Sequence, residues 1–271
     1  MNKIITVFIF LYCQINYSQE LFVVTDPASN IPTNTLNVHF MQSVFKEKFI
    51  DGYNYHLMPE VSYGIHKKIM VRTSIFVSNI SNQFVVEGGS LYTKYRFYST
   101  DDLNTHFRLA AFGRYSFNNS DNHPDIHTEQ IEIMTHNSGY EGGIIATKLI
   151  KKVAISSSVS FEKVIDNRFN SFPIYYGRDA TNYTLSIGKL IYPRKYTSLK
   201  QTNINLILEF VGQSINQKDK SYLDIVPAVQ FIINSQARID FAYRQEILSS
   251  MLRTSPNGFY LNLEYNFFNS F

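Results

Sequence analysis

The sequence lacks tryptophan altogether and contains a single cysteine among its 271 residues. One cysteine cannot form an intramolecular disulfide, so a small fold held together by disulfide bonds is excluded. No stretch of the chain reaches the roughly 18 consecutive apolar residues that a membrane-spanning helix requires. Charge is balanced, with 25 basic and 22 acidic residues and no run of five like charges. This balance argues against a nucleic-acid partner and against a charged tail.

Aromatic residues are abundant instead, with 22 Phe and 19 Tyr. A compact soluble domain seldom needs so many rings. A membrane β-barrel uses them in its lipid-facing band and in the girdles at both interfaces. An aromatic-rich secreted β-sandwich would have a similar composition, so composition alone leaves both folds open.

The first 18 residues have the order of a secretory signal peptide. Met1-Asn2-Lys3 is a short positive start, residues 4–12 are apolar, and Ser18 is a small residue suited to cleavage. Cys13 would suggest a lipoprotein, but bulky Tyr12 stands where that signal needs a small residue. We therefore predict a signal peptide at residues 1–18. Residues 19–33, with two prolines and small polar residues, are interpreted as an extended periplasmic lead-in to a barrel at 34–271.

Alternation of apolar and polar residues predicts strands in the rest of the chain. In residues 237–248 one face carries Ile239, Phe241 and Tyr243, and the other carries four charged residues, Arg238, Asp240, Arg244 and Glu246. Four charges on one face suit a water-filled lumen, because unpaired charges are costly in a dry core. The last segment, 259–268, alternates in the same way.

Twelve such segments can be recognised, and an even number returns the chain to its starting side. The weakest alternation is in residues 130–150, where three glycines indicate a bulge or a close approach, and Gly88-Gly89 could break residues 84–99. The predicted strands are 34–47, 53–65, 69–80, 84–99, 105–117, 130–150, 153–164, 179–192, 203–213, 222–233, 237–248 and 259–268.

Connections between these segments tend to alternate between short and long. Short ones such as 66–68, 151–152 and 234–236 would be periplasmic turns, although 193–202 is long for that role. The long connections are rich in Asn, Ser, Asp, Gly and Pro and would be extracellular loops: 118–129, 167–178, 214–221 and 249–257. The connection 81–83 is short for an extracellular loop. We predict an all-β, antiparallel, up-and-down transmembrane barrel of about 12 strands, with both chain termini periplasmic.

The segments HLMPEVSYGIHKKIMVRTSIF and VEGGSLYTKYRF, with the final strand PNGFYLNLEYNFFNSF, resemble uncharacterised transporter-like outer-membrane barrels of Bacteroidetes, over residues 35–271. Those barrels are loosely similar to the transporter group associated with phenol degradation. The resemblance implies two partners, outer-membrane lipid and a barrel-assembly machinery that recognises the strand ending at Phe271. It supplies no substrate and no catalytic residues.

Charged residues on the predicted inner face are the main candidates for function. They could line a pore for a small polar or aromatic solute, or they could form a salt-bridged plug in a narrow barrel. A non-conducting barrel acting through its outer loops is the alternative. The lumen-lining candidates are Arg72, Lys94, Arg96, Arg108, Arg114, Glu209, Asp224, Arg238, Asp240, Arg244, Glu246 and Glu264.

Catalysis and metal binding have little support in the sequence. His123, His127 and His136 lie among carboxylates in the segment NHPDIHTEQIEIMTH. Imidazole and carboxylate groups suit zinc, copper or nickel, but we favour the interpretation that this segment is a polar surface loop. A membrane-embedded hydrolase would need a nucleophile, a base and an orienting group, and none of the usual catalytic motifs is present. We therefore expect neither an enzyme nor a cofactor.

Overall fold

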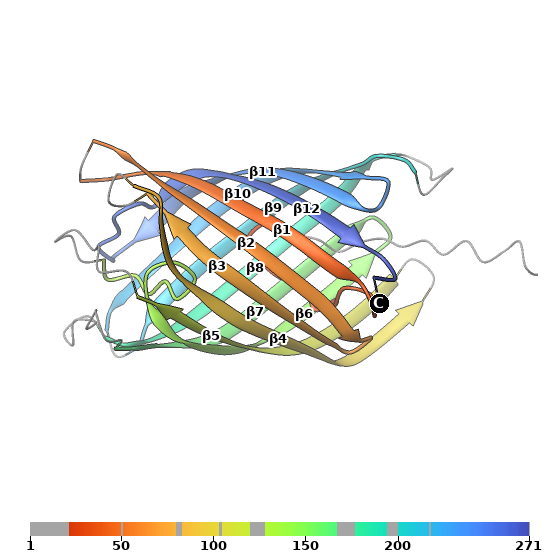
Figure 1. Ribbon diagram of the computed structural model, residues 1–271, viewed down its shortest axis with the longest axis horizontal. Helices are drawn as coiled ribbons and strands as arrows, with labels where there is room; N and C mark the ends of the chain where they lie inside the picture. The colour runs from red at the N-terminus through yellow and green to blue at the C-terminus, as the bar shows by residue number, and fades with distance from the viewer. Residues whose placement is uncertain are drawn as a thin grey trace, which may run out of the picture.

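The computed structural model is a closed β-barrel of twelve antiparallel strands (Figure 1). It describes residues 22–49, 51–79, 83–102, 105–119, 128–166, 177–193, 200–216 and 218–270. The strands are β1 (Leu36–Lys46), β2 (Tyr53–His66), β3 (Ile69–Ser78), β4 (Val85–Asp102), β5 (Thr105–Asn118), β6 (Ser138–Ile150), β7 (Val153–Ile165), β8 (Asp179–Tyr192), β9 (Asn203–Ile215), β10 (Lys220–Ile233), β11 (Ala237–Ser249) and β12 (Asn257–Phe267).

Each strand pairs with its neighbours in the sequence, and β1 pairs with β12 to close the ring. The closing register runs without a shift from Leu36 opposite Phe267 to Lys46 opposite Asn257. Closure leaves no edge strand with unpaired backbone groups. The predicted fold class and number of strands are confirmed. Within the described residues, no helix is long and apolar enough to span a membrane.

The two faces of the wall follow the predicted alternation. On β12, Phe259, Leu263 and Tyr265 are exposed outward, whereas Tyr260 and Asn262 are buried inside. Many of the exposed large side chains elsewhere on the wall are likewise apolar or aromatic. Such a surface is disfavoured in water and favourable in hydrocarbon, so it suits a barrel surrounded by lipid.

Two details of the strands differ from the prediction. β6 begins at Ser138, so residues 130–137 are not part of the predicted 130–150 strand. β4 runs unbroken through Gly88 and Gly89. A Cβ atom on Gly88 would lie 2.0 Å from the carbonyl oxygen of Phe117, so glycine permits a close approach here without ending the strand.

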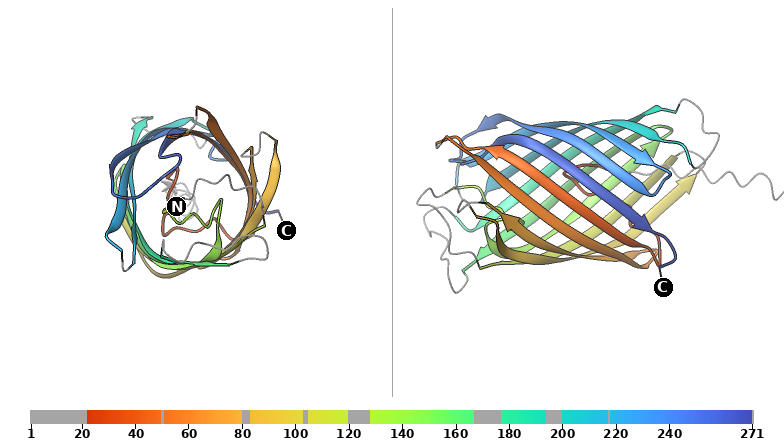
Figure 2. Two further views of the ribbon diagram at one scale, coloured as in Figure 1. Left: turned by 90° about the vertical axis from the view of Figure 1, so that its left-hand side faces the viewer. Right: turned by 45° about the horizontal axis from the view of Figure 1, so that its top comes forward.

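The segment before β1 lies inside the barrel and not ahead of it. The chain turns over Gly64, where a Cβ atom would lie 2.1 Å from the carbonyl oxygen of Pro32. Asn34 adopts a left-handed φ of 56° in this turn, which Asn tolerates better than most residues, and its N–H donates to Gly64 O at 2.9 Å. Residues 22–33, most of the segment predicted as a periplasmic lead-in, thus lie within the barrel lumen (Figure 2).

A second segment folds inward from the other end of the barrel. Residues 128–137 precede β6 and carry Ile131 and Ile133, both about 2% exposed. These side chains pack with Val164 and Ile215 in the barrel interior. The lumen is therefore narrowed from both ends, by residues 22–33 at the end where β1 begins and by residues 128–137 at the opposite end (Figure 2).

Candidate functional site

A cavity of about 1350 Å³ remains in the lumen between these two segments and the wall. Its lining includes residues of the N-terminal segment, of the 128–137 segment and of the inner barrel face. Charged and polar groups contribute much of this lining, among them Arg72, Arg114, Glu60 and His39. The cavity is large enough for a small solute, and its wall offers hydrogen bonds of both polarities.

The twelve charged candidates from the sequence divide into two groups. Four of them, Glu209, Asp224, Asp240 and Glu246, do not border the cavity, and the first three are completely buried. The other eight border it: Arg72, Lys94, Arg96, Arg108, Arg114, Arg238, Arg244 and Glu264.

Glu209 on β9 anchors the N-terminal segment. Its Oε2 atom accepts hydrogen bonds from the backbone N–H groups of Val23, at 3.1 Å, and Val24, at 3.0 Å. Its Oε1 atom accepts the N–H of Thr25 at 3.0 Å and the Thr25 hydroxyl at 2.7 Å. One carboxylate therefore satisfies three consecutive buried or partly buried amides, which would otherwise lose their hydrogen bonds to water.

Asp26 extends this attachment to β3. Its two carboxylate oxygens accept hydrogen bonds from Arg72 Nη2 at 3.1 Å and Nη1 at 3.3 Å, a bidentate pair. Burial by itself would raise the pKa of Asp26, but the positive charges of Arg72 and Lys94 outweigh it and hold that pKa well below its usual range. Asp26 is therefore an anion at neutral and mildly acidic pH.

Further polar groups of the wall bind the backbone of the same segment. Lys94 Nζ donates to the carbonyl oxygen of Pro27 at 2.7 Å, and the Thr147 hydroxyl accepts the N–H of Ala28 at 2.8 Å. Arg108 Nη1 donates to Ser29 Oγ at 2.8 Å. Together with Phe22 and Val23, which pack against inward apolar side chains, these contacts hold residues 22–29 against the wall.

The 128–137 segment is held through side chains instead of a strand ladder. Gln213 on β9 accepts the N–H of Ile131 at 2.9 Å and donates to its carbonyl oxygen at 2.9 Å. Glu162 on β7 accepts the N–H of Ile133 at 3.1 Å. These two side chains replace the backbone partners that a neighbouring strand would supply, so the segment can leave the wall without orphaned amides.

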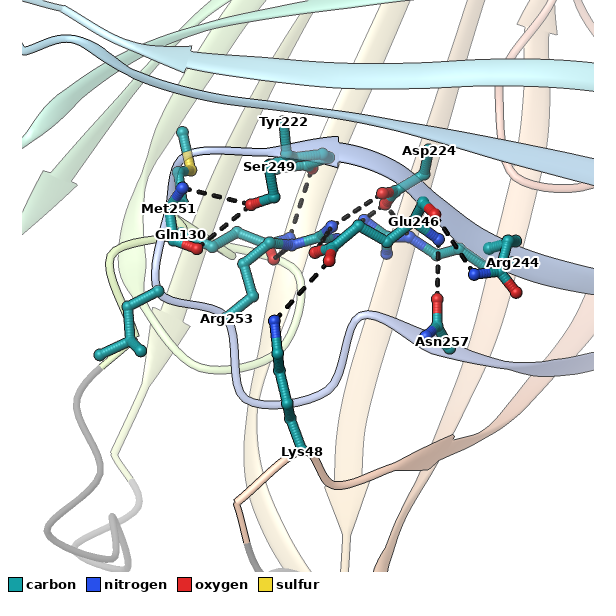
Figure 3. A network of polar contacts seen from close by, with 12 residues as sticks. Lys48, Gln130, Tyr222, Asp224, Arg244, Glu246, Ser249, Met251, Arg253 and Asn257 are labelled. Atoms are coloured by element: carbon teal, nitrogen blue, oxygen red, sulfur yellow. Dashed lines mark hydrogen bonds and ion pairs between the residues drawn. The ribbon is translucent and has the colours of Figure 1, made fainter.

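Arg253 is the centre of a buried ionic network near the same end of the barrel (Figure 3). It lies in the connection between β11 and β12 and is 1% exposed. Its Nη1 and Nη2 atoms each donate a hydrogen bond of 2.7 Å to a carboxylate oxygen of Asp224, which makes the pair bidentate. It also contacts Glu246 at 3.1 Å, and its guanidinium carbon lies 3.8 Å from the centre of the Tyr222 ring. Arg253 Nε donates to Gln130 at 2.7 Å, which ties the 128–137 segment to this network.

The other charged candidates are paired on the wall. Arg238 contacts Glu264 at 2.8 Å and Asp240 at 3.1 Å, and Arg114 contacts Glu141 at 3.3 Å. Opposite charges on the same strand or on neighbouring strands therefore neutralise each other across much of the lumen. Arg96 differs, because its guanidinium donates to the backbone carbonyl of Lys67 in the β2–β3 turn at 2.8 Å.

Several residues of the site were missed by the sequence reasoning. Arg253 lies in residues 249–257, which the sequence indicates as an exposed loop, and Asp26 lies in the presumed lead-in. Neither position carries a periodic signal. Glu60 was detectable, since it lies two residues from Met58 and from Ser62 and shares the inner face of β2 with them.

Of the three histidines that could bind a metal, the structure describes His136. His123 and His127 lie outside the described residues. His136 is described, with Nε2 3.4 Å from Glu132 and its ring centre 5.2 Å from that of His56. Among the described residues, no group of three or more His, Cys, Asp or Glu side chains is arranged to hold a metal ion.

Comparison with solved structures identifies similar barrels. An outer-membrane channel of Pseudomonas putida F1 is 12% identical with a TM-score of 0.54, and the match covers 89% of this chain and 98% of the channel. KdgM porin (12% identity, TM-score 0.46, 86% and 99% covered) and the CymD monoaromatic hydrocarbon channel (8%, 0.42, 89% and 90%) also match. No family model and no curated protein matches the chain. At this identity, the likeness to the Pseudomonas channel establishes the fold of an outer-membrane barrel and does not identify a solute.

Proposed function

We propose that this chain is an outer-membrane barrel that acts as a narrow pore for a small polar or aromatic solute, with residues 22–33 restricting passage. The observation that carries the proposal is the 1350 Å³ cavity, lined by charged side chains inside a wall whose outer face is apolar. A soluble protein would not present such a face to water, and a barrel whose interior was completely filled by paired side chains would leave no such cavity.

The restriction follows from the contacts of the N-terminal segment. Phe22 and Val23 pack against the inner wall, and Glu209 and Arg72 bind the segment through charged hydrogen bonds. A solute that crosses the barrel must pass beside these residues or displace them. We therefore expect a small basal conductance and a larger one when the segment is released.

Orientation in the membrane is part of the same proposal. The connections after the even-numbered strands open at the end where β1 begins, and most of them are short. In bacterial barrels the short turns are periplasmic. We therefore propose that residues 22–33 enter the barrel from the periplasmic end, that the Arg253 network lies at the extracellular end, and that both chain termini are periplasmic.

Planar-bilayer recordings would test the pore. The purified barrel should give small, stable conductance steps, and a variant that lacks residues 22–31 should give steps several-fold larger. Asp219→Asn, at an exposed position in the β9–β10 turn, is the control variant and should give the same conductance steps as the unsubstituted barrel. A deletion variant that folds, as judged by heat-modifiable gel migration, and yet stays silent would contradict the pore and favour the non-conducting alternative.

A further inference from the structure

Three cationic side chains surround the carboxylate of Asp26 on the cavity side. Arg72 binds it directly, and Lys94 and Arg114 lie near enough to lower its pKa. The Arg72 guanidinium lies 5.1 Å and the Arg114 guanidinium 5.2 Å from the centre of the Tyr92 ring. Stacking on a buried ring fixes both guanidiniums in position, so the cationic site is preorganised.

Two carboxylates of the wall, Glu60 and Glu141, lie near this site. Arg114 has Glu141 as a partner at 3.3 Å. Glu60 is 3.9 Å from Arg72, but it also accepts hydrogen bonds at 2.8 Å from Ser74 and contacts His39 at 2.8 Å. The bidentate partner of Arg72 is therefore Asp26, a residue of the N-terminal segment and not of the barrel wall.

Asp26 and Arg72 can both be reached from the cavity. Their side chains are 24% and 18% exposed, and both residues border the 1350 Å³ space. The planar guanidinium fork recognises a carboxylate by its two oxygens, whether the carboxylate belongs to the chain or to a dissolved molecule. A solute carboxylate that replaced Asp26 would meet the same donors in the same geometry.

We propose that Asp26 occupies a binding site for a small organic carboxylate, and that such a solute competes with Asp26 for Arg72. This inference rests on the proposed pore function and names its solute class. Competition couples the solute to the segment, because each carboxylate that binds Arg72 releases one of the charged attachments of residues 22–29. Glu209, Lys94 and Arg108 keep their contacts with the segment, so binding loosens it at Asp26 and keeps it within the barrel.

Direct binding to the full-length barrel in detergent micelles tests the site. Benzoate serves as the probe and benzamide as its neutral isostere, with binding measured by the rise of the thermal unfolding midpoint and by calorimetry. A tethered carboxylate competes at an effective concentration in the millimolar range or above. We therefore expect Asp26→Asn to lower the Kd for benzoate at least tenfold relative to the unsubstituted chain, and benzamide to bind neither protein measurably.

Two further variants complete the test. Arg72→Gln should abolish benzoate binding in the Asp26→Asn background. Asp166→Asn should leave the Kd unchanged, because Asp166 pairs with Arg178 away from the lumen. A variant lacking residues 22–31 replaces Asp26→Asn if the latter does not fold, and it should also bind benzoate more tightly than the unsubstituted chain.

Equal affinity with and without Asp26, equal binding of benzamide, or binding that survives Arg72→Gln would each overturn the proposal. The assay needs no conductance, so its result is independent of the bilayer recordings. If a barrel without conductance bound benzoate, the pore hypothesis would be wrong and the carboxylate site would stand. If the barrel conducted and did not bind benzoate, the pore would stand and this solute class would be wrong.

Discussion

Arg253 and Asp224 form a bidentate ion pair in which both partners are withdrawn from solvent, with contacts of 2.7 Å between Nη1 and Oδ1 and between Nη2 and Oδ2. Asp224 also accepts a hydrogen bond from Arg244 at 2.5 Å. The pair joins a residue between β11 and β12 to the inner face of β10. It therefore fixes a connection that the sequence alone indicates as an exposed loop.

Arg253→Ala should destabilise the barrel by about 3–5 kcal/mol, because the carboxylate of Asp224 loses a partner while it stays buried. Urea titration of the folded barrel in lipid vesicles, followed by gel mobility, measures this loss. Arg178→Ala is the matched control, since it breaks a bidentate pair with Asp166 that is partly exposed and should cost only about 0.2–1 kcal/mol. Equal losses for the two variants would show that the Arg253 pair has no special role.

Glu209→Gln should release the N-terminal segment. An amide has one acceptor oxygen in place of two, so at least one of the three consecutive N–H groups loses its partner. Each hydrogen bond to a charged group contributes about 1.5–3 kcal/mol, so the released state should gain roughly tenfold to a hundredfold in population. Single-channel recording should show more frequent large openings, and unchanged recordings would mean that the segment is held by its other contacts.

Val159→Arg should impair membrane folding. Val159 is in the middle of β7 and is 50% exposed on the outer face. Arginine at the lipid midplane of a barrel costs about 2–4 kcal/mol. Its neighbour Ser158 borders the cavity, so Ser158→Arg is the control and should fold nearly normally. Folding yields in vesicles separate the two, and a reversed order would mean that the wall faces are assigned the wrong way round.

The attachment of Asp26 should survive mild acid. Its folded-state pKa is depressed, so its contribution to stability is present above the unfolded value of about 3.9 and is lost as pH falls through the folded value. The difference in unfolding free energy between the unsubstituted chain and Asp26→Asn should therefore be constant from pH 7 to pH 5 and fall only below about pH 4. Urea titrations at several pH values measure it, and a difference that vanished by pH 5 would contradict the depressed pKa.

The architecture of the wall was predictable because it depends on a period of two. On β11, Arg238 and Asp240 alternate with Ile239 and Phe241, and the structure places the charged pair inside and the apolar pair toward lipid. Each strand repeats this rule along its length, so the fold class follows from the sequence. The inward direction of the charged candidates follows for the same reason.

The contents of the lumen were not predictable from that rule. Gln130-Ile131-Glu132-Ile133 alternates as a strand would, yet Ile131 and Ile133 point into the barrel, because the side chains of Gln213 and Glu162 satisfy their amides. These partners are about 82 and 29 residues away in the chain. Contacts between such distant positions leave no mark on local periodicity. The same holds for Asp26 and Arg72.

The hydrogen bond from Asn262 Nδ2 to the carbonyl oxygen of Val23, at 3.0 Å, has a consequence for the order of assembly. Val23 precedes every strand, and Asn262 belongs to the strand that closes the ring. While β12 is unpaired the sheet is open, and residues 22–33 can be laid against its concave face from the side. After β1 and β12 have paired, the same segment can enter the lumen only through one of the two ends of the barrel. The hydrogen bond to Asn262 therefore links the placement of residues 22–33 to the closure of the β1–β12 seam.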